Sequence, residues 1–276
     1  MKKERVSKDF NESNMPHNRI EVFKDIMLNR SNTLFSVGLL LLVFAIPLII
    51  AVIFSSQAIG SFNEYTEENY QQLLLTLNTN NLLVMIGIMI LSIGLAGSYK
   101  IIRMLIWQEG IFFMHDFFKG IKENIKNFLL TGFFIGLLNL VTQYLYFNVS
   151  VSEYAIMACI IVIAIFMPSV LFILGQSIIY KLPYGQLFKN AILLAWRNFY
   201  TSVPVLILNA ALVVIPTFLQ NIGYILYNLL IPIFIAPLLI MFNMLYTDTL
   251  FDKYINKTNF KEIYDKGIYR NGKSRN

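Results

Sequence analysis

Residues 34–54 read LFSVGLLLLVFAIPLIIAVIF, an apolar run without one charged side chain. At a rise of 1.5 Å per residue, about 20 apolar residues cross the roughly 30 Å hydrocarbon core of a bilayer. Five further runs of this kind follow, at residues 82–98, 128–147, 154–179, 202–219 and 225–246. The sequence therefore predicts an all-α polytopic membrane protein with six transmembrane helices.

The composition agrees with this fold class. Of 276 residues, 57% are hydrophobic and 14% are charged, whereas about a quarter of a soluble domain is charged. We divide the chain into an N-terminal segment (1–33), a six-span membrane domain (34–246) and a C-terminal tail (247–276). The single cysteine, Cys159, lies in the fourth run, and one thiol cannot form an internal disulfide or a zinc cluster.

The basic residues fix the expected orientation. All 22 Lys and Arg lie in four segments, 1–33, 99–127, 180–201 and 247–276, and the alternate connections carry only acids. By the positive-inside rule, both termini and the two basic loops are predicted to be cytoplasmic. Nucleic acid binding is the rival interpretation of a net charge of +6, but the cations are dispersed among span ends, so we expect no nucleic acid partner.

Two cytoplasmic segments show helical amphipathicity, at 109–127 and 185–199. We expect each to lie at the membrane interface as a separate helix. A shift of 70 residues superposes them, which leaves an internal duplication open. The candidate residues for contact with a protein partner or with anionic lipid are Phe117, Phe118, Lys119, Lys122, Lys126, Lys189 and Arg197. A third apolar pattern, just before the first span, indicates either a short interfacial helix or a solvated tail.

The spans contain uncharged polar side chains, of which four are candidates for a polar path: Asn139, Gln143, Gln176 and Asn209. A transporter would need them to converge on a wet cavity. Hydrogen bonds between helices are the more usual role of such amides. Small residues four apart, such as Gly132 and Gly136, permit close helix contact.

No motif predicts catalysis or a cofactor. Residues 267–274 match the phosphate-loop pattern, but no strand pattern precedes them and only two residues follow. His115 and Asp116 could form an acid–base pair, although a solvated polar face is the simpler interpretation. The sequence offers no cluster with metal-ligand spacing and no nucleophile motif. We therefore predict a non-enzymatic protein without catalytic, cofactor or metal sites.

The segment GLAGSYKIIR (94–103), followed by QEGIFFMHDFFKGIKENIKNF (108–128), resembles the YesL-like family of bacterial integral membrane proteins, as does FKNAILLA (188–195). The domain of that family has no established function. Its members often occur beside sugar importers and glycoside-degrading enzymes. The resemblance implies a bacterial cell membrane protein with an accessory role in carbohydrate import through an ABC-type importer, and it supplies no catalytic residue. The alternative is a small-molecule transporter or facilitator in its own right.

Overall fold

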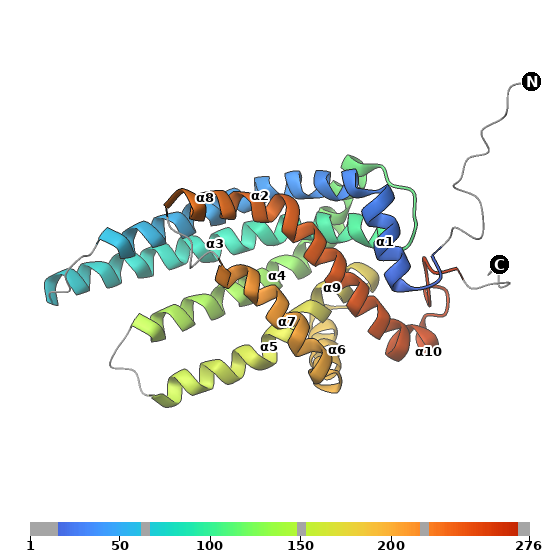
Figure 1. Cartoon of the computed structure of the whole chain (residues 1–276). Helices are drawn as coiled ribbons and strands as arrows, with labels where there is room; N and C mark the ends of the chain where they lie inside the picture. The colour runs from blue at the N-terminus through green and yellow to red at the C-terminus, as the bar shows by residue number, and fades with distance from the viewer. Residues whose placement is uncertain (1–15, 62–66, 148–152, 216–220, 270–276) are drawn as a thin grey trace, which may run out of the picture.

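The computed structural model describes residues 16–61, 67–147, 153–215 and 221–269 (Figure 1). All regular elements within these ranges are helical. They are α1 (Arg19–Asn29), α2 (Ser31–Ser61), α3 (Glu67–Ile106), α4 (Phe113–Phe147), α5 (Glu153–Ile179), α6 (Tyr184–Arg197), α7 (Phe199–Val214), α8 (Asn221–Leu230), a π-helical turn (Ile231–Ile235), α9 (Ala236–Phe251), a second π-helical turn (Asp252–Asn256) and α10 (Lys257–Asn259).

Five helical stretches in the described ranges are long and apolar enough to cross a membrane. They contain α2, α3, α4, α5 and the run from α8 to α10. The pair α6 and α7 also passes when taken together, but it is bent by 103°. The predicted class of fold is thus confirmed: the chain is an all-helical, multi-pass membrane protein with five to six spans. The last part of the predicted fifth span, 216–219, lies outside the described residues.

Helix α6 crosses the bundle, and its two faces differ. Its buried face carries Leu187, Ala191, Leu194 and Ala195, and the last three pack on α5 and on the end of α9. Leu193 and Trp196 are about 60% exposed on the other face. This pattern agrees with the predicted amphipathic helix at 185–199, with slightly different bounds.

The predicted separate interfacial helix at 109–127 is wrong in its layout. A single 35-residue helix, α4, runs from Phe113 through the third span without a break. It is about 50 Å long, so it exceeds the hydrocarbon core and its first turns project beyond it. Within the apolar stripe, Phe117 and Phe128 are fully buried against Gly97 and Tyr99 of α3, whereas Met114 and Phe118 remain exposed. The two units of the possible duplication also differ, since α4 is continuous and α6–α7 is bent.

Helices α3 and α4 form a close antiparallel pair over glycines. A Cβ added at Gly132 would lie 2.7 Å from Ser92 Oγ, and one at Gly136 would lie 2.7 Å from Met85 Cγ. A third contact places the Phe117 ring against Gly97, where an added Cβ would come within 2.8 Å. The expectation that small residues permit close helix contact is confirmed for this pair.

The tail is part of the folded structure as far as Tyr269. Gly267 has φ of +83°, and its backbone lies so close to Ile106 and Trp107 at the end of α3 that no Cβ fits. The Tyr269 amide donates to Pro16 O at 2.8 Å. Helix α1 buries Val22 and Ile26 completely, so it packs on protein and is neither a solvated tail nor a helix lying only on lipid. The first and last described residues, Pro16 and Tyr269, therefore lie together, and α1 and α10 lie at the same end of the bundle (Figure 1).

We call this end, with α1, the start of α4, α6 and α10, the basic end. The positive-inside rule predicts that it faces the cytoplasm, which single cysteines in a Cys159→Ala background can test. Gln71→Cys lies on the exposed far part of α3, and Lys122→Cys and Lys189→Cys are exposed at the basic end. We expect an impermeant thiol reagent to label only Gln71→Cys on intact cells, and all three after the cells are opened. Labelling of Lys122→Cys from outside would contradict the orientation.

Candidate functional site

A buried cluster of charges lies at the basic end, where α1 meets α9. Arg19 Nη2 is 2.6 Å from Asp248 Oδ2 and 2.7 Å from Asp252 Oδ2. Only the contact to Asp252 is aligned as a hydrogen bond, so Asp248 is held mainly by charge. The side chains of Asp248 and Arg19 are 1% and 12% exposed. Because an uncompensated buried charge costs several kcal/mol, the guanidinium is what permits two carboxylates here.

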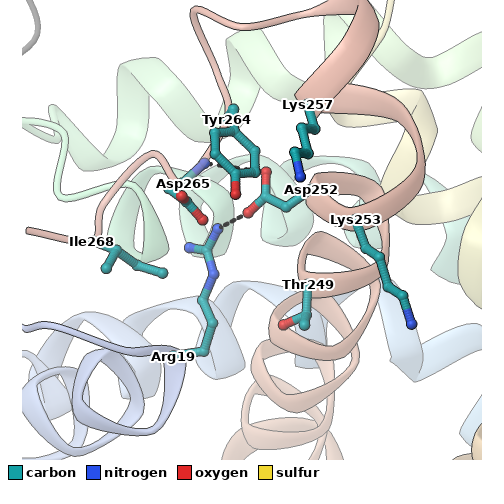
Figure 2. Close-up of a pocket in the computed structure, with 8 residues that line it drawn as sticks. All are labelled: Arg19, Thr249, Asp252, Lys253, Lys257, Tyr264, Asp265 and Ile268. Carbon is teal, nitrogen blue, oxygen red and sulfur yellow. Dashed lines mark hydrogen bonds and ion pairs between the residues drawn. The ribbon is translucent and has the colours of Figure 1, made fainter. Parts of the chain in front are cut away.

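Arg19 also contacts the C-terminal tail. Its Nη1 donates to the Lys266 carbonyl at 3.0 Å, and Asp252 Oδ1 accepts from the Asp265 amide at 3.2 Å. Figure 2 shows Arg19 pointing to Asp252, with Asp265 beside them. A cavity of about 300 Å³ adjoins these groups. It is lined by Arg19, Thr249, Asp252, Lys253, Lys257, Tyr264, Asp265 and Ile268.

A second set of charges joins the end of α3 to the tail. Glu109 accepts from Arg103 Nη2 at 2.8 Å and from Lys266 Nζ at 2.6 Å, one cation on each carboxylate oxygen. Both cations lie 4.5 Å from the centre of the Trp107 ring. The indole thus contacts two cations, each of which also pairs with Glu109. This distance to the ring favours cation–π attraction.

Tyr180, directly after α5, connects α5 to the cluster. Its hydroxyl donates to Asn256 Oδ1 at 2.5 Å, and Asn256 Nδ2 donates to Asp252 Oδ1 at 2.9 Å. Burial, with the carboxylates of Asp248 and Asp252 nearby, raises the pKa of the Tyr180 phenol. The phenol therefore stays protonated and remains a donor.

The cluster is suited to holding elements together. Arg19, Asp252 and Glu109 each already have opposite charges or hydrogen-bond partners. Within the described ranges, no group of three or more His, Cys, Asp or Glu side chains could hold a metal ion. Sequence reasoning missed this cluster because its members are up to 247 residues apart. The one available signal was Asp248 and Asp252, two acids four apart at the end of an apolar run.

The predicted contact residues differ in exposure: one is buried and the others are exposed. Phe117 is fully buried against Gly97, Phe44 and Phe113, so its place on a contact surface is wrong. Helical periodicity showed that this face is apolar but could not show that α3 covers it. Phe118 is 52% exposed, and the remaining predicted contact residues, Lys119, Lys122, Lys126, Lys189 and Arg197, are exposed as well. The Arg197 guanidinium lies over the Tyr254 ring at 4.2 Å.

The intramembrane amides do not form one described network. Asn209 on α7 and Asn243 on α9 exchange two hydrogen bonds, of 3.1 and 2.9 Å, which is the helix-bridging role. Gln176 on α5 is fully buried, and neither of its amide atoms has a hydrogen-bond partner among the described residues. Asn139 and Gln143 are half-buried on α4, a helix that packs mainly on α3 and α5.

The remaining motifs have structural roles where they are described. Asp116 Oδ2 accepts from the Phe112 amide at 2.7 Å and so caps the start of α4. His115 is exposed beside it, with Nδ1 3.2 Å from Asp116 Oδ1. In the phosphate-loop match, Gly267 is packed against α3, and residues 270–276 lie outside the described ranges.

Comparisons with protein-family models, with curated proteins and with solved structures find no match to this chain. The class of protein is therefore defined by its own fold: it is a polytopic helical membrane protein.

Removal of the Arg19 side chain should destabilise the whole bundle. Arg19→Ala leaves Asp248 and Asp252 buried without their cation, which should cost about 3–5 kcal/mol. The check is the unfolding midpoint of purified protein in detergent. Lys24→Ala, an exposed change on the same helix, is the matched control and should be neutral. Equal midpoints for the two variants would contradict a structural role for the cluster.

The two kinds of buried amide should respond in opposite directions. Asn243→Leu leaves Asn209 without its partner and should destabilise the protein by about 1 kcal/mol. Gln176→Leu removes an amide that has no partner in the described structure, so it should be neutral or stabilising. Thermal unfolding in detergent measures both. A loss of stability in Gln176→Leu as large as that in Asn243→Leu would show that Gln176 is hydrogen-bonded.

Proposed function

We propose that this chain is a non-catalytic accessory protein of an ABC-type carbohydrate importer in a bacterial cell membrane. The observation that carries the proposal is an exposed apolar surface on the first turns of α4 and the residue before them. Phe112 is 80% exposed, Met114 56% and Phe118 52%, and Lys119 and Lys122 follow on the same helix. We call these five residues the α4 tip.

The position of the α4 tip favours contact with a protein over contact with the bilayer interior. Helix α4 is about 50 Å long and the hydrocarbon core is about 30 Å thick, so its basic start projects beyond the lipid tails. Exposed aromatic side chains rimmed by lysines, outside the hydrocarbon, are typical of a docking surface. The resemblance to the YesL-like family is densest over the same residues, and it supplies the kind of partner.

The α4 tip is held in a fixed position on α3, which also supports a docking role. The buried Phe117 fixes the tip on α3, and Lys100 Nζ pairs with Glu123 Oε2 at 3.0 Å one helical turn beyond Lys119. A surface that is fixed before binding loses less conformational freedom when a partner docks. The alternative function, a transporter or facilitator in its own right, is favoured by one observation, the unpartnered buried amide of Gln176.

The test is recovery of importer subunits with the full-length protein from native membranes. Phe112→Ala with Phe118→Ala removes two apolar contacts worth about 1.5–3 kcal/mol each when buried, so recovery should fall at least tenfold. Identification of an importer permease and ATPase subunit, each measured against the amount of bait, is the readout.

The matched control is Leu193→Ala with Trp196→Ala, which removes two exposed apolar side chains from α6. It should leave recovery unchanged. Both variants must elute as single symmetric peaks before they are compared. The proposal is wrong if importer subunits are not recovered with the wild-type chain, or if the α4 variant recovers them as well as the control does.

A further inference from the structure

A groove lies between α4, α5 and α6, away from the charge cluster. Its volume is about 500 Å³, within the range of about 300–1,000 Å³ that is typical of small-ligand sites. The walls are almost wholly apolar: Leu130, Phe134, Leu137, Leu138, Val162, Phe166, Tyr184, Gly185 and Phe188.

Four aromatic rings from three helices line the groove. Phe134 of α4 stacks on Tyr184 of α6 at 6.3 Å between ring centres and contacts Phe166 of α5 at 6.4 Å. Phe188 contacts both Phe166 and Tyr184. Thr131 Oγ1 lies 3.3 Å from the Tyr184 hydroxyl. The contacts between rings fix the groove's shape without a bound molecule.

Three lysines lie within one helical turn of residues that line the groove, on the side of the basic end. On α4, Lys126, Leu130 and Phe134 follow at four-residue spacing and so share one face. On α6, Lys189 lies one turn after Gly185. Lys181 lies three residues before Tyr184, the first residue of α6. All three lysines are exposed, and none forms a salt bridge within the described ranges.

We propose that this groove binds one anionic phospholipid. An acyl chain lies along the apolar wall, which runs about 12 Å along α4 from Leu130 to Leu138, and the headgroup phosphate meets Lys126, Lys181 and Lys189. Both parts of the lipid are matched. The apolar groove suits the acyl chain, and the lysines lie at the level of the headgroups. Long lysine side chains reach that level while their stems stay on apolar surface.

The occupant is an anionic lipid and not a partner helix, because of the shape and charge of the site. A helix is about 10 Å across with its side chains, so a segment as long as the wall of about 12 Å on α4 would need roughly twice the groove's volume of about 500 Å³. A zwitterionic lipid would fill the groove equally well but would gain less from three unpaired cations. The net charge of the headgroup therefore decides the preference.

The test uses full-length protein in detergent and native mass spectrometry, with phosphatidylglycerol and phosphatidylcholine as the probes. We expect phosphatidylglycerol to be retained at one molecule per chain, at least tenfold more tightly than phosphatidylcholine. Lys126→Gln, Lys181→Gln and Lys189→Gln together should abolish that preference. The control with the same loss of charge, Lys24→Gln, Lys253→Gln and Lys257→Gln, should preserve it.

A second variant tests the groove itself. Nothing lies within 4 Å of a Cβ added at Gly185, so the backbone there accepts a side chain, and Gly185→Phe adds a ring to the groove wall that should lower phosphatidylglycerol binding at least tenfold. Equal retention of the two lipids by the wild-type chain would overturn the proposal. So would unchanged binding in Gly185→Phe, which would mean that the lysines hold a headgroup without a chain in the groove.

Discussion

The hydrocarbon core of a bilayer offers no hydrogen bonds, and this constraint shapes the rest of the molecule. Backbone amides and carbonyls must be paired within each segment, so the described spans are helices. Charges are excluded from the centre for the same reason and gather at the basic end. Where they are then buried under protein, they must be compensated locally, and Arg19 does this for Asp248 and Asp252. The cluster is therefore a consequence of folding both chain ends over the spans.

Within a bilayer, an apolar side chain gains little when it exchanges contact with lipid for contact with another helix. The helices are therefore held together by close packing and by a few polar contacts. The glycines at 97, 132 and 136 let α4 approach α3 along most of its length. The amide pair Asn209–Asn243 joins α7 to α9 in the same environment. Helices α2 and α3 combine both means, since Gly87 and Gly94 lie close against α2 and Asn80 Nδ2 donates to Ala51 O at 3.2 Å.

The six apolar runs, the close-contact glycines and the amphipathic character of 185–199 could all be predicted from the sequence, because each depends on composition or spacing within one segment. The burial of Phe117 could not, because periodicity shows that a face is apolar without showing what covers it. The cluster around Arg19 could not either, since it joins residues 19, 248 and 252. The same limit applies to the groove, whose walls come from three helices. Only the amphiphilic spacing of Lys126, Leu130 and Phe134 was visible in advance.

The aromatic residues of α4 now divide into three environments that follow from its continuity. Phe117 faces α3, Phe134 faces the groove, and Phe118 faces outward at the basic end. The first contact fixes the helix, so the α4 tip does not depend on what fills the groove. Helix α6 differs, because its buried face packs on α5 and Tyr184 meets α4 through its ring contact with Phe134 and one 3.3 Å contact to Thr131. An anionic lipid between them would add apolar contacts and neutralise the lysines of both helices. Such a lipid would therefore strengthen the contact between α6 and α4 and leave the proposed partner surface on α4 unchanged.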